Sequence, residues 1–317
     1  MDNGANMNAI LIDRELKAYL SAYKKLNLTV HSVFKEAINL VDEKGELITL
    51  LTANRDIGPM GVLVSQNSRN FTKIVPGERV EKRISTLFFK SSKVTLNYTN
   101  AKEWDRCLGN CQCNLSEEVL VPKRSQVRKV LLDRGEATGL LPLICALERY
   151  KGVKDKCVAI ENNTYSEFIQ DVFLELVKLL DQDDFEGVIS ILPKFIGFGP
   201  GLTPSTDDFL SGVLLTKRAE CLFDNRPVDA LDMLALKVYE NACGRTTKVS
   251  ESMLKHVAQG RATENQIQLI EAIFSPESNS IEGCTRRVLM NGATSGSDFV
   301  LGVYCSLLLH KVKEPLL

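Results

Sequence analysis

The sequence predicts an α+β protein in which a β-rich N-terminal part, an antiparallel sheet or barrel, precedes an α-helical C-terminal part. Between about residues 30 and 100, short runs of β-branched and aromatic residues are separated by turn signals such as Gly58-Pro59, with no helical run between them. After about residue 115, apolar residues instead recur at the three- and four-residue intervals of helices. The chain has 317 residues, of which 44% are hydrophobic and 25% charged, which is typical of a globular protein with room for two domains.

Residues 1–28 are expected to form a helix ahead of the β-rich domain. Apolar or aromatic side chains recur there every three or four positions, at Leu11, Ile12, Leu16, Tyr19, Leu20 and Tyr23. The β-rich domain is expected over residues 29–115, with strands within the runs TVHSVFKEAINLV, LITLLT, GVLVS, TLFFK and KVTLNYT.

The α-helical domain is expected over residues 116–317. Its predicted helices lie after Pro122, in GLLPLICALERY with a break near Pro142, over 166–180 with Ser166 as N-cap, and over 227–243, 246–260 and 263–274. Two more helices are expected to begin near Asp208 and Asp298, each after a loop rich in glycine and hydroxyl groups.

The charge and cysteine content exclude several classes of function. The formal net charge of −1 argues against nucleic acid or an anionic membrane as a partner. No secretory signal and no stretch of about 20 apolar residues is evident, so a cytoplasmic location is expected. Nine cysteines spread along the chain indicate reduced thiols. Cys107, Cys111 and Cys113 have a C-x3-C-x-C spacing that is not typical of zinc sites, so no metal is expected there.

Two loops, at 197–207 and 292–297, form a weak internal repeat because each leads into the pattern D-F-x-x-G-V, at 208–213 and 298–303. A glycine one turn into a helix allows another backbone to approach closely. We therefore expect the two helices to pack against each other at Gly212 and Gly302, with both loops opening around a shared pocket.

The loops predict a ligand with two different ends. Glycine-rich helix starts expose backbone N–H groups where the helix dipole adds positive charge, which suits a phosphate or carboxylate. Asp207 and Asp208 would repel a bare anion, so the ligand must also carry N–H groups. Asp208 aligns with Asp298 and both are N-cap candidates, which leaves Asp207 as the carboxylate expected to be freer to meet a ligand, although either could serve. The other candidate binding residues are Gly199, Gly201, Thr203, Ser205, Thr206, Thr294, Ser295, Gly296 and Asp298.

A third segment, GRTTKVSESMLKHVAQG at 244–260, places Arg245 before two threonines at an expected helix start. Arg245 either clamps a carboxylate or phosphate through two hydrogen bonds, or lies on the surface while Thr246 caps the helix. No Ser–His or Cys–His triad is evident, so catalysis is expected to rest on positioning and electrostatics.

These three segments, in this order, resemble the AllH-like family, long known as a domain of unknown function. HSVFKEAINLV and GPMGVLV resemble its N-terminal part, so the match covers roughly residues 30–310. The family's namesake is a subunit of oxamate carbamoyltransferase, which acts in anaerobic allantoin degradation and converts oxalurate and phosphate to oxamate and carbamoyl phosphate. The resemblance departs at Thr206, near which the family pattern has a glycine.

The resemblance implies a small anionic carbamoyl or ureido substrate and two other carbamoyltransferase subunits as partners. It implies that the loop around Gly199, Gly201 and Thr203 holds the anionic end of the substrate and that an aspartate accepts from the N–H end. The implied catalytic residues are Asp207, Asp208 and Arg245, with Thr246 and Thr247 as further binding residues.

Two other functions stay open at this point. One is a non-catalytic carboxylate-binding or scaffold subunit. The other is a stand-alone enzyme acting on a phosphorylated substrate, with Mg²⁺ held by Asp207 and Asp208 as its cofactor. A homodimer of the isolated chain is also open.

Overall fold

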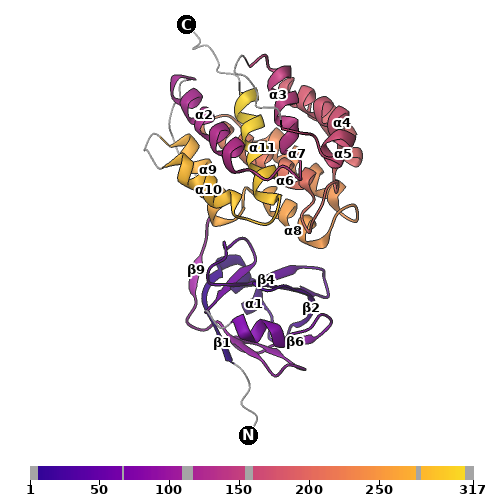
Figure 1. Ribbon diagram of the computed structural model, residues 1–317. Coiled ribbons are helices and arrows are strands. Elements are labelled where there is room, and N and C mark those ends of the chain that lie inside the picture. The colour runs from indigo at the N-terminus through magenta and orange to yellow at the C-terminus, as the bar shows by residue number, and fades with distance from the viewer. Residues whose placement is uncertain (1–5, 66–67, 109–116, 154–159, 276–279, 311–317) are drawn as a thin grey trace. The chain divides into compact units, whose positions relative to one another are not determined.

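The computed structural model describes residues 6–65, 68–108, 117–153, 160–275 and 280–310, and it divides into two compact units (Figure 1). The first unit comprises residues 1–106 with 262–264, and the second comprises 107–261 with 265–317. All strands lie in the first unit and nearly all helices in the second, so the predicted α+β class, β-rich part first, is confirmed.

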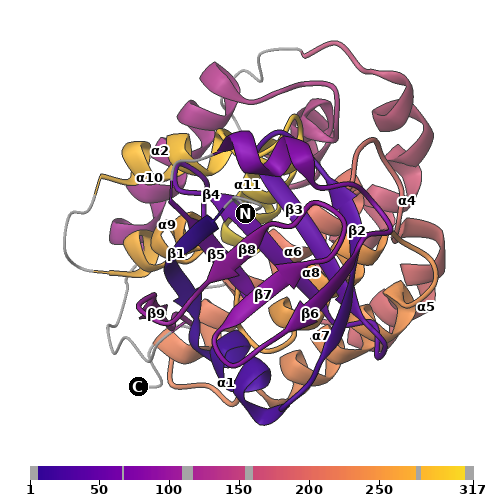
Figure 2. The same ribbon diagram turned by 90° about the horizontal axis from the view of Figure 1, so that it is seen from below.

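The described strands of the first unit form one sheet in the order β5-β4-β3-β2-β6-β7-β8-β1-β9, and pairing of β1 with β5 closes it into a barrel (Figure 2). The sheet is mixed, because β1 runs parallel to β8 and β9 and β4 runs parallel to β5. The antiparallel expectation is wrong for these pairs, because no tight hairpin joins the two strands of a parallel pair. The strands are β1 (Asn6–Asp13), β2 (Asn27–Val33), β3 (Ala37–Asp42), β4 (Leu47–Thr52), β5 (Gly61–Val64), β6 (Arg79–Lys82), β7 (Thr86–Phe89), β8 (Thr95–Asn97) and β9 (Lys102–Trp104).

The helix expected over residues 1–28 is wrong for its first part, which is strand β1. Met7 and Ala9 are buried between exposed neighbours, as in a strand, and only α1 (Arg14–Ala22) is helical. Leu16 and Leu20 of α1 join the core of the barrel. Pairing with strands distant in sequence therefore overrides the local helical spacing.

The second unit is built around the helices α6 and α11, which are buried along most of their length. Both views place α11 between α2, α9 and α10 on one side and α4 and α5 on the other (Figures 1 and 2). The helices are α2 (Glu117–Arg134), α3 (Ile144–Tyr150), α4 (Thr164–Asp181), α5 (Phe185–Phe195), α6 (Ser205–Phe223), α7 (Asp229–Ala242), α8 (Lys248–Val257), α9 (Glu264–Phe274), α10 (Ile281–Leu289) and α11 (Ser295–Leu309).

The starts of three helices differ from the sequence prediction. The N-cap of α4 is Asn163, which forms a capping box with Ser166. The helices α6 and α11 begin three residues before Asp208 and Asp298, so neither aspartate is an N-cap. Pro204 holds the N-cap position of α6 with φ −54°, a backbone angle that proline favours.

Two further expectations concern cysteines and the membrane. Cys107 is an exposed free thiol, while Cys111 and Cys113 lie outside the described residues. Among the described residues, no three or more His, Cys, Asp or Glu side chains gather as ligands for a metal ion. No helix within the described ranges has the length and apolar character that a bilayer crossing requires.

Candidate functional site

The two glycines of the D-F-x-x-G-V repeat make the close crossing of α6 and α11 that the sequence predicted. A Cβ atom on Gly212 would lie 2.1 Å from the carbonyl oxygen of Phe299, and one on Gly302 would lie 2.1 Å from that of Phe209. The contact is therefore reciprocal, and neither position tolerates a side chain without moving a helix backbone. The crossing brings the two loops and the first turns of both helices together.

Asp208 and Asp298 face each other across this crossing and are almost entirely removed from solvent. Asp208 is 2% exposed and Asp298 is 0% exposed. Oδ1 of Asp298 accepts a hydrogen bond of 2.7 Å from the backbone N–H of Leu140. A Cβ atom on Gly139 would lie 2.5 Å from each carboxyl oxygen of Asp298, so this approach of the 139–140 backbone requires glycine.

The protonation of this pair is shifted from that of ordinary aspartates. Burial raises the pKa of Asp208 well above its usual range, and the charge of Asp298 raises it further. Burial likewise raises the pKa of Asp298 to about 7, although the nearby Ser205 hydroxyl and the hydrogen bond from the Leu140 N–H oppose this rise. The cause in both cases is that the charged form loses its hydration.

Three buried polar atoms around the pair have no well-formed hydrogen bond within the described part of the chain. They are Oδ2 of Asp208, Oδ2 of Asp298 and Oγ of Ser205. The Ser205 hydroxyl lowers the pKa of Asp298, but its oxygen has no hydrogen-bond partner among the described residues. Buried polar groups are nearly always paired, so three together indicate a place where a ligand supplies the partners.

A pair of partly exposed hydroxyls joins the two loops beside Asp208. Thr203 Oγ1 and Ser295 Oγ are 2.6 Å apart, and both side chains lower the pKa of Asp208. Each aspartate is thus influenced by a serine from the other helix start, Asp208 by Ser295 and Asp298 by Ser205. The serine of each helix thus acts on the aspartate of the other helix, just as Gly212 and Gly302 each pack against the backbone of the other helix.

Asp207, expected to be the freer carboxylate, is instead the satisfied one. Its Oδ1 accepts from the backbone N–H of Gly197 at 2.8 Å, and its Oδ2 accepts from Thr246 Oγ1 at 2.5 Å and Ser250 Oγ at 2.6 Å. The earlier assignment of Asp207 and Asp208 is therefore reversed. Asp207 fixes the glycine-rich loop to the start of α8, and Asp208 keeps a buried oxygen without a partner.

Hydrogen bonds between Thr206 and Phe198 join the two ends of the glycine-rich loop at its base. Thr206 Oγ1 accepts from the backbone N–H of Phe198 at 3.0 Å and donates to its carbonyl oxygen at 2.9 Å. Gly199 and Gly201 have φ values of +120° and +96°, which other residues rarely adopt. Among the described residues, the N–H groups of Gly199, Gly201 and Thr203 donate no hydrogen bond, as an anion-binding loop requires.

The structure places Arg245 and the neighbouring threonines away from the acid pair. The exposed Arg245 donates from Nη1 to the carbonyl oxygen of Asn241 at 3.1 Å. Thr246 bonds to Asp207, and Thr247 is the N-cap of α8 and donates to the carbonyl oxygen of Leu202. These contacts hold the loop in place and put no guanidinium beside Asp208 or Asp298.

The second loop contributes one helix-packing glycine and one buried hydroxyl. A Cβ atom on Gly296 would lie 2.2 Å from the carbonyl oxygen of Val288, so Gly296 serves the packing of α11 against α10. Thr294 is buried beside Asp298 and lowers its pKa. Sequence reasoning did not include Gly139 and Leu140 in the site, and the glycine just before an apolar helical run was the signal available.

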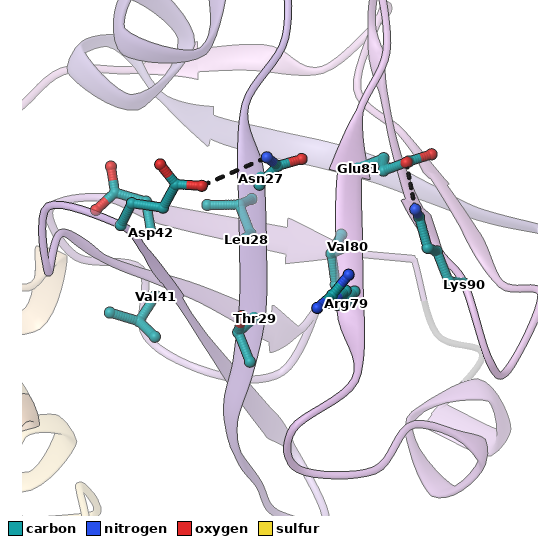
Figure 3. Close-up of a pocket in the computed structure, with 10 residues that line it drawn as sticks. Asn27, Leu28, Thr29, Val41, Asp42, Arg79, Val80, Glu81 and Lys90 are labelled. Atoms are coloured by element: carbon teal, nitrogen blue, oxygen red, sulfur yellow. Dashed lines mark hydrogen bonds and ion pairs between the residues drawn. The ribbon is translucent and has the colours of Figure 1, made fainter.

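A separate polar hollow of about 400 Å³ lies across β2, β3 and β6 of the barrel unit (Figure 3). Lys90 Nζ there pairs with Glu81 Oε1 at 2.5 Å. Oδ1 of Asp42 accepts from the backbone N–H groups of Lys44 and Glu46. None of the residues predicted as functional from the sequence lines this hollow.

Fold and site together define a two-part α+β protein, in which a closed mixed barrel accompanies a helical unit with a buried acid pair at the crossing of two glycine-bearing helices. The chain belongs to the AllH family. Residues 8–103 match the model of the AllH family N-terminal domain, and residues 195–307 match the model described as oxamate carbamoyltransferase subunit AllH. No solved structure matches the chain. The second match spans both loops, both aspartates of the pair and all of α8.

Proposed function

We propose that this chain is a subunit of a carbamoyltransferase that acts together with two other subunits in the cytoplasm. The reaction is the phosphate-dependent cleavage of oxalurate to oxamate and carbamoyl phosphate, in the catabolism of allantoin nitrogen. The family description supports a role as a subunit of oxamate carbamoyltransferase. The unpartnered Oδ2 atoms of Asp208 and Asp298 are the observation that carries the proposal for this chain's own site.

The ligand chemistry follows from the two kinds of group in the site. The N–H groups of Gly199, Gly201 and Thr203, free within the described residues, suit the phosphate or the carboxylate of oxalurate. The carboxyl oxygens of Asp208 and Asp298 suit the N–H groups of a ureido or carbamoyl group.

Entry to the pair requires a change at the two loops. The partly exposed hydroxyls of Thr203 and Ser295 bond to each other beside the buried Asp208. A ligand that reaches Asp208 replaces this mutual bond with bonds to itself. The positive φ values of Gly199 and Gly201 give the first loop the backbone freedom for such a movement.

The test is to co-purify the chain with its candidate partner subunits and to measure carbamoyl phosphate formed from oxalurate and phosphate. We expect turnover by the assembled complex, and a loss of about 10²-fold or more with Asp208→Ala, as for removal of a transition-state contact. Asp171→Asn, an exposed aspartate on α4, serves as the matched control. Absence of turnover in every combination of subunits contradicts the proposal.

The main alternative is a non-catalytic binding subunit, for which Asp208→Ala leaves the activity of the complex intact. A Mg²⁺ site on Asp207 and Asp208 has less support, because three donors already occupy the oxygens of Asp207. EDTA added to the assay separates that alternative, since it would abolish activity only if a divalent cation is required.

A further inference from the structure

The acid pair at the α6–α11 crossing lacks any compensating positive side chain. Among the described residues, no Lys, Arg or His forms an ion pair with Asp208 or Asp298. Thr203, Thr294, Ser295 and Ser205 contribute hydroxyls, and Leu140 contributes a backbone N–H. The further charged group that acts on Asp208 is Asp207, which is also acidic.

Two ionised carboxylates in such a place would repel each other without a counter-charge. The N-terminal ends of α6 and α11 supply partial positive charge, which stabilises about one negative charge rather than two. One shared proton resolves the conflict, because one carboxyl then donates while the other accepts. The pair would thus present a donor and an acceptor side by side at its unpartnered Oδ2 atoms.

The proposed reaction needs both of these roles. An oxygen of HPO₄²⁻ attacks the ureido carbonyl carbon of oxalurate, and the bond from that carbon to the oxamate nitrogen breaks. The leaving nitrogen must gain a proton, because an amide anion is a poor leaving group. The carbamoyl phosphate formed must lose the proton that HPO₄²⁻ carried, so one proton moves from phosphate to nitrogen and the balance closes.

We propose that Asp208 and Asp298 are a proton relay, in which one carboxyl protonates the leaving nitrogen and the other takes up the proton from phosphate. This inference rests on the proposed function, since it assigns the two residues catalytic roles in that reaction. It is carried by three buried, unpartnered polar atoms at one helix crossing, beside which no basic side chain of the described residues forms an ion pair.

The first experiment measures the proton on the pair without relying on activity. The carboxyl carbons of Asp208 and Asp298 are followed by ¹³C NMR between pH 4 and pH 9 in the isolated full-length chain, with Asp208→Asn and Asp298→Asn for assignment. We expect one proton to remain on the pair well above about pH 4, where ordinary aspartates titrate. Titration of both carboxyls in the ordinary aspartate range, at about pH 4, overturns the relay.

The second experiment compares two substrates in the assembled complex. With oxalurate, Asp208→Asn and Asp298→Asn are expected to lower kcat by about 10²- to 10⁴-fold, the usual contribution of general acid–base catalysis. With an aryl carbamate whose phenolate leaves without a proton, the variant at the carboxyl that protonates the leaving nitrogen is expected to lose less than about tenfold. The variant at the carboxyl that takes up the proton from phosphate is expected to keep its full loss, because phosphate must still give up that proton. Asp171→Asn leaves both rates unchanged, and thermal unfolding of each variant confirms that it is folded.

If both variants lose equally on the two substrates, the relay is overturned, because the pair is then assigned to binding or folding, while the proposed function stands. If the wild-type complex cleaves neither substrate with phosphate, the proposed function fails and the relay fails with it. The NMR titration then still reports whether the pair holds a proton, so the two failures are distinguishable.

Discussion

Two groups of buried carboxyls in the helical unit are treated in opposite ways. Glu148 on α3 is 2% exposed and is fully engaged, since Arg128 donates to both of its oxygens and the Tyr304 hydroxyl donates to Oε1 at 2.8 Å. Asp208 and Asp298 are buried to the same degree, yet each keeps an oxygen without a partner. The fold can therefore supply hydrogen-bond partners to both oxygens of a buried carboxyl, as it does for Glu148.

The difference indicates which buried acids serve the fold and which are kept for a ligand. A satisfied buried ion pair becomes costly only when one member is removed. A buried carboxyl that lacks a hydrogen-bond partner lowers the stability of the folded protein, and such a loss of stability persists where function requires the carboxyl. Asp207 and Asp208 show the same contrast within two adjacent residues, the first fully bonded and the second not.

The largest expected effect concerns Glu148, the buried carboxyl whose two oxygens both accept hydrogen bonds. Glu148→Ala leaves Arg128 and Tyr304 without this acceptor in the interior, so the free energy of unfolding should fall by about 3–5 kcal/mol. Urea unfolding measures the loss, with Glu148→Gln as an intermediate variant that keeps one acceptor oxygen. Activity per folded molecule in the complex should stay unchanged. A loss of activity without loss of stability would break the comparison.

A smaller effect is expected at the helix crossing on which the acid pair depends. In Gly302→Ala the new methyl group would lie 2.1 Å from the Phe209 carbonyl oxygen, so α6 and α11 must separate. We expect a loss of about 3 kcal/mol in the free energy of unfolding, as for overpacking in a core.

Gly283→Ala on α10 is the matched control for this variant. The nearest side-chain atom to its new methyl group is Ser280 Oγ at 3.3 Å, so little must move. The free energy of unfolding should stay within about 1 kcal/mol of the wild type, because alanine favours helix more than glycine does. Equal destabilisation by the two variants would contradict the assignment of Gly302 to the crossing.

The repeat in the sequence was sufficient to predict this crossing but not the roles of the aspartates. The D-F-x-x-G-V spacing placed Gly212 and Gly302 at the contact, because only a missing side chain permits it. The choice between Asp207 and Asp208 depended on Thr246 and Ser250, which lie about 40 residues further along the chain. Successive residues of a helix point in different directions, and only the tertiary contacts decide which direction is filled.

In the β-rich unit, too, the sequence predicted local elements but not the contacts between distant residues. The runs that became β3, β4, β5, β7 and β8 were evident from their composition. Strand β1 was missed because its pairing with β5, β8 and β9 involves residues 50 or more positions away. Local periodicity therefore indicated the class of each unit, while the closure of the barrel depended on contacts that periodicity does not contain.

The last prediction concerns the stability cost of the unsatisfied pair and its dependence on pH. The pKa of Asp298 in the folded chain is raised to about 7, above that of the unfolded chain at about 4. Below the pKa of the unfolded chain, Asp298 holds its proton in both the folded and the unfolded state, so its titration does not lower the free energy of unfolding. As pH rises toward the folded pKa, the unfolded state loses its proton first, so the free energy of unfolding falls by up to about 1.4 kcal/mol per pH unit.

Asp298→Asn removes this titration while its amide oxygen still accepts from the Leu140 N–H. At pH 8 the variant should be more stable than the wild type by about 2 kcal/mol. The variant gains stability because it no longer buries a charge, but the new amide N–H has no acceptor, and this cost reduces the gain. At pH 4.5 this advantage should vanish. Urea unfolding at both pH values decides the matter, with Asp171→Asn as control. A variant that is equally destabilised at both pH values would show that Asp298 serves the fold, as Glu148 does.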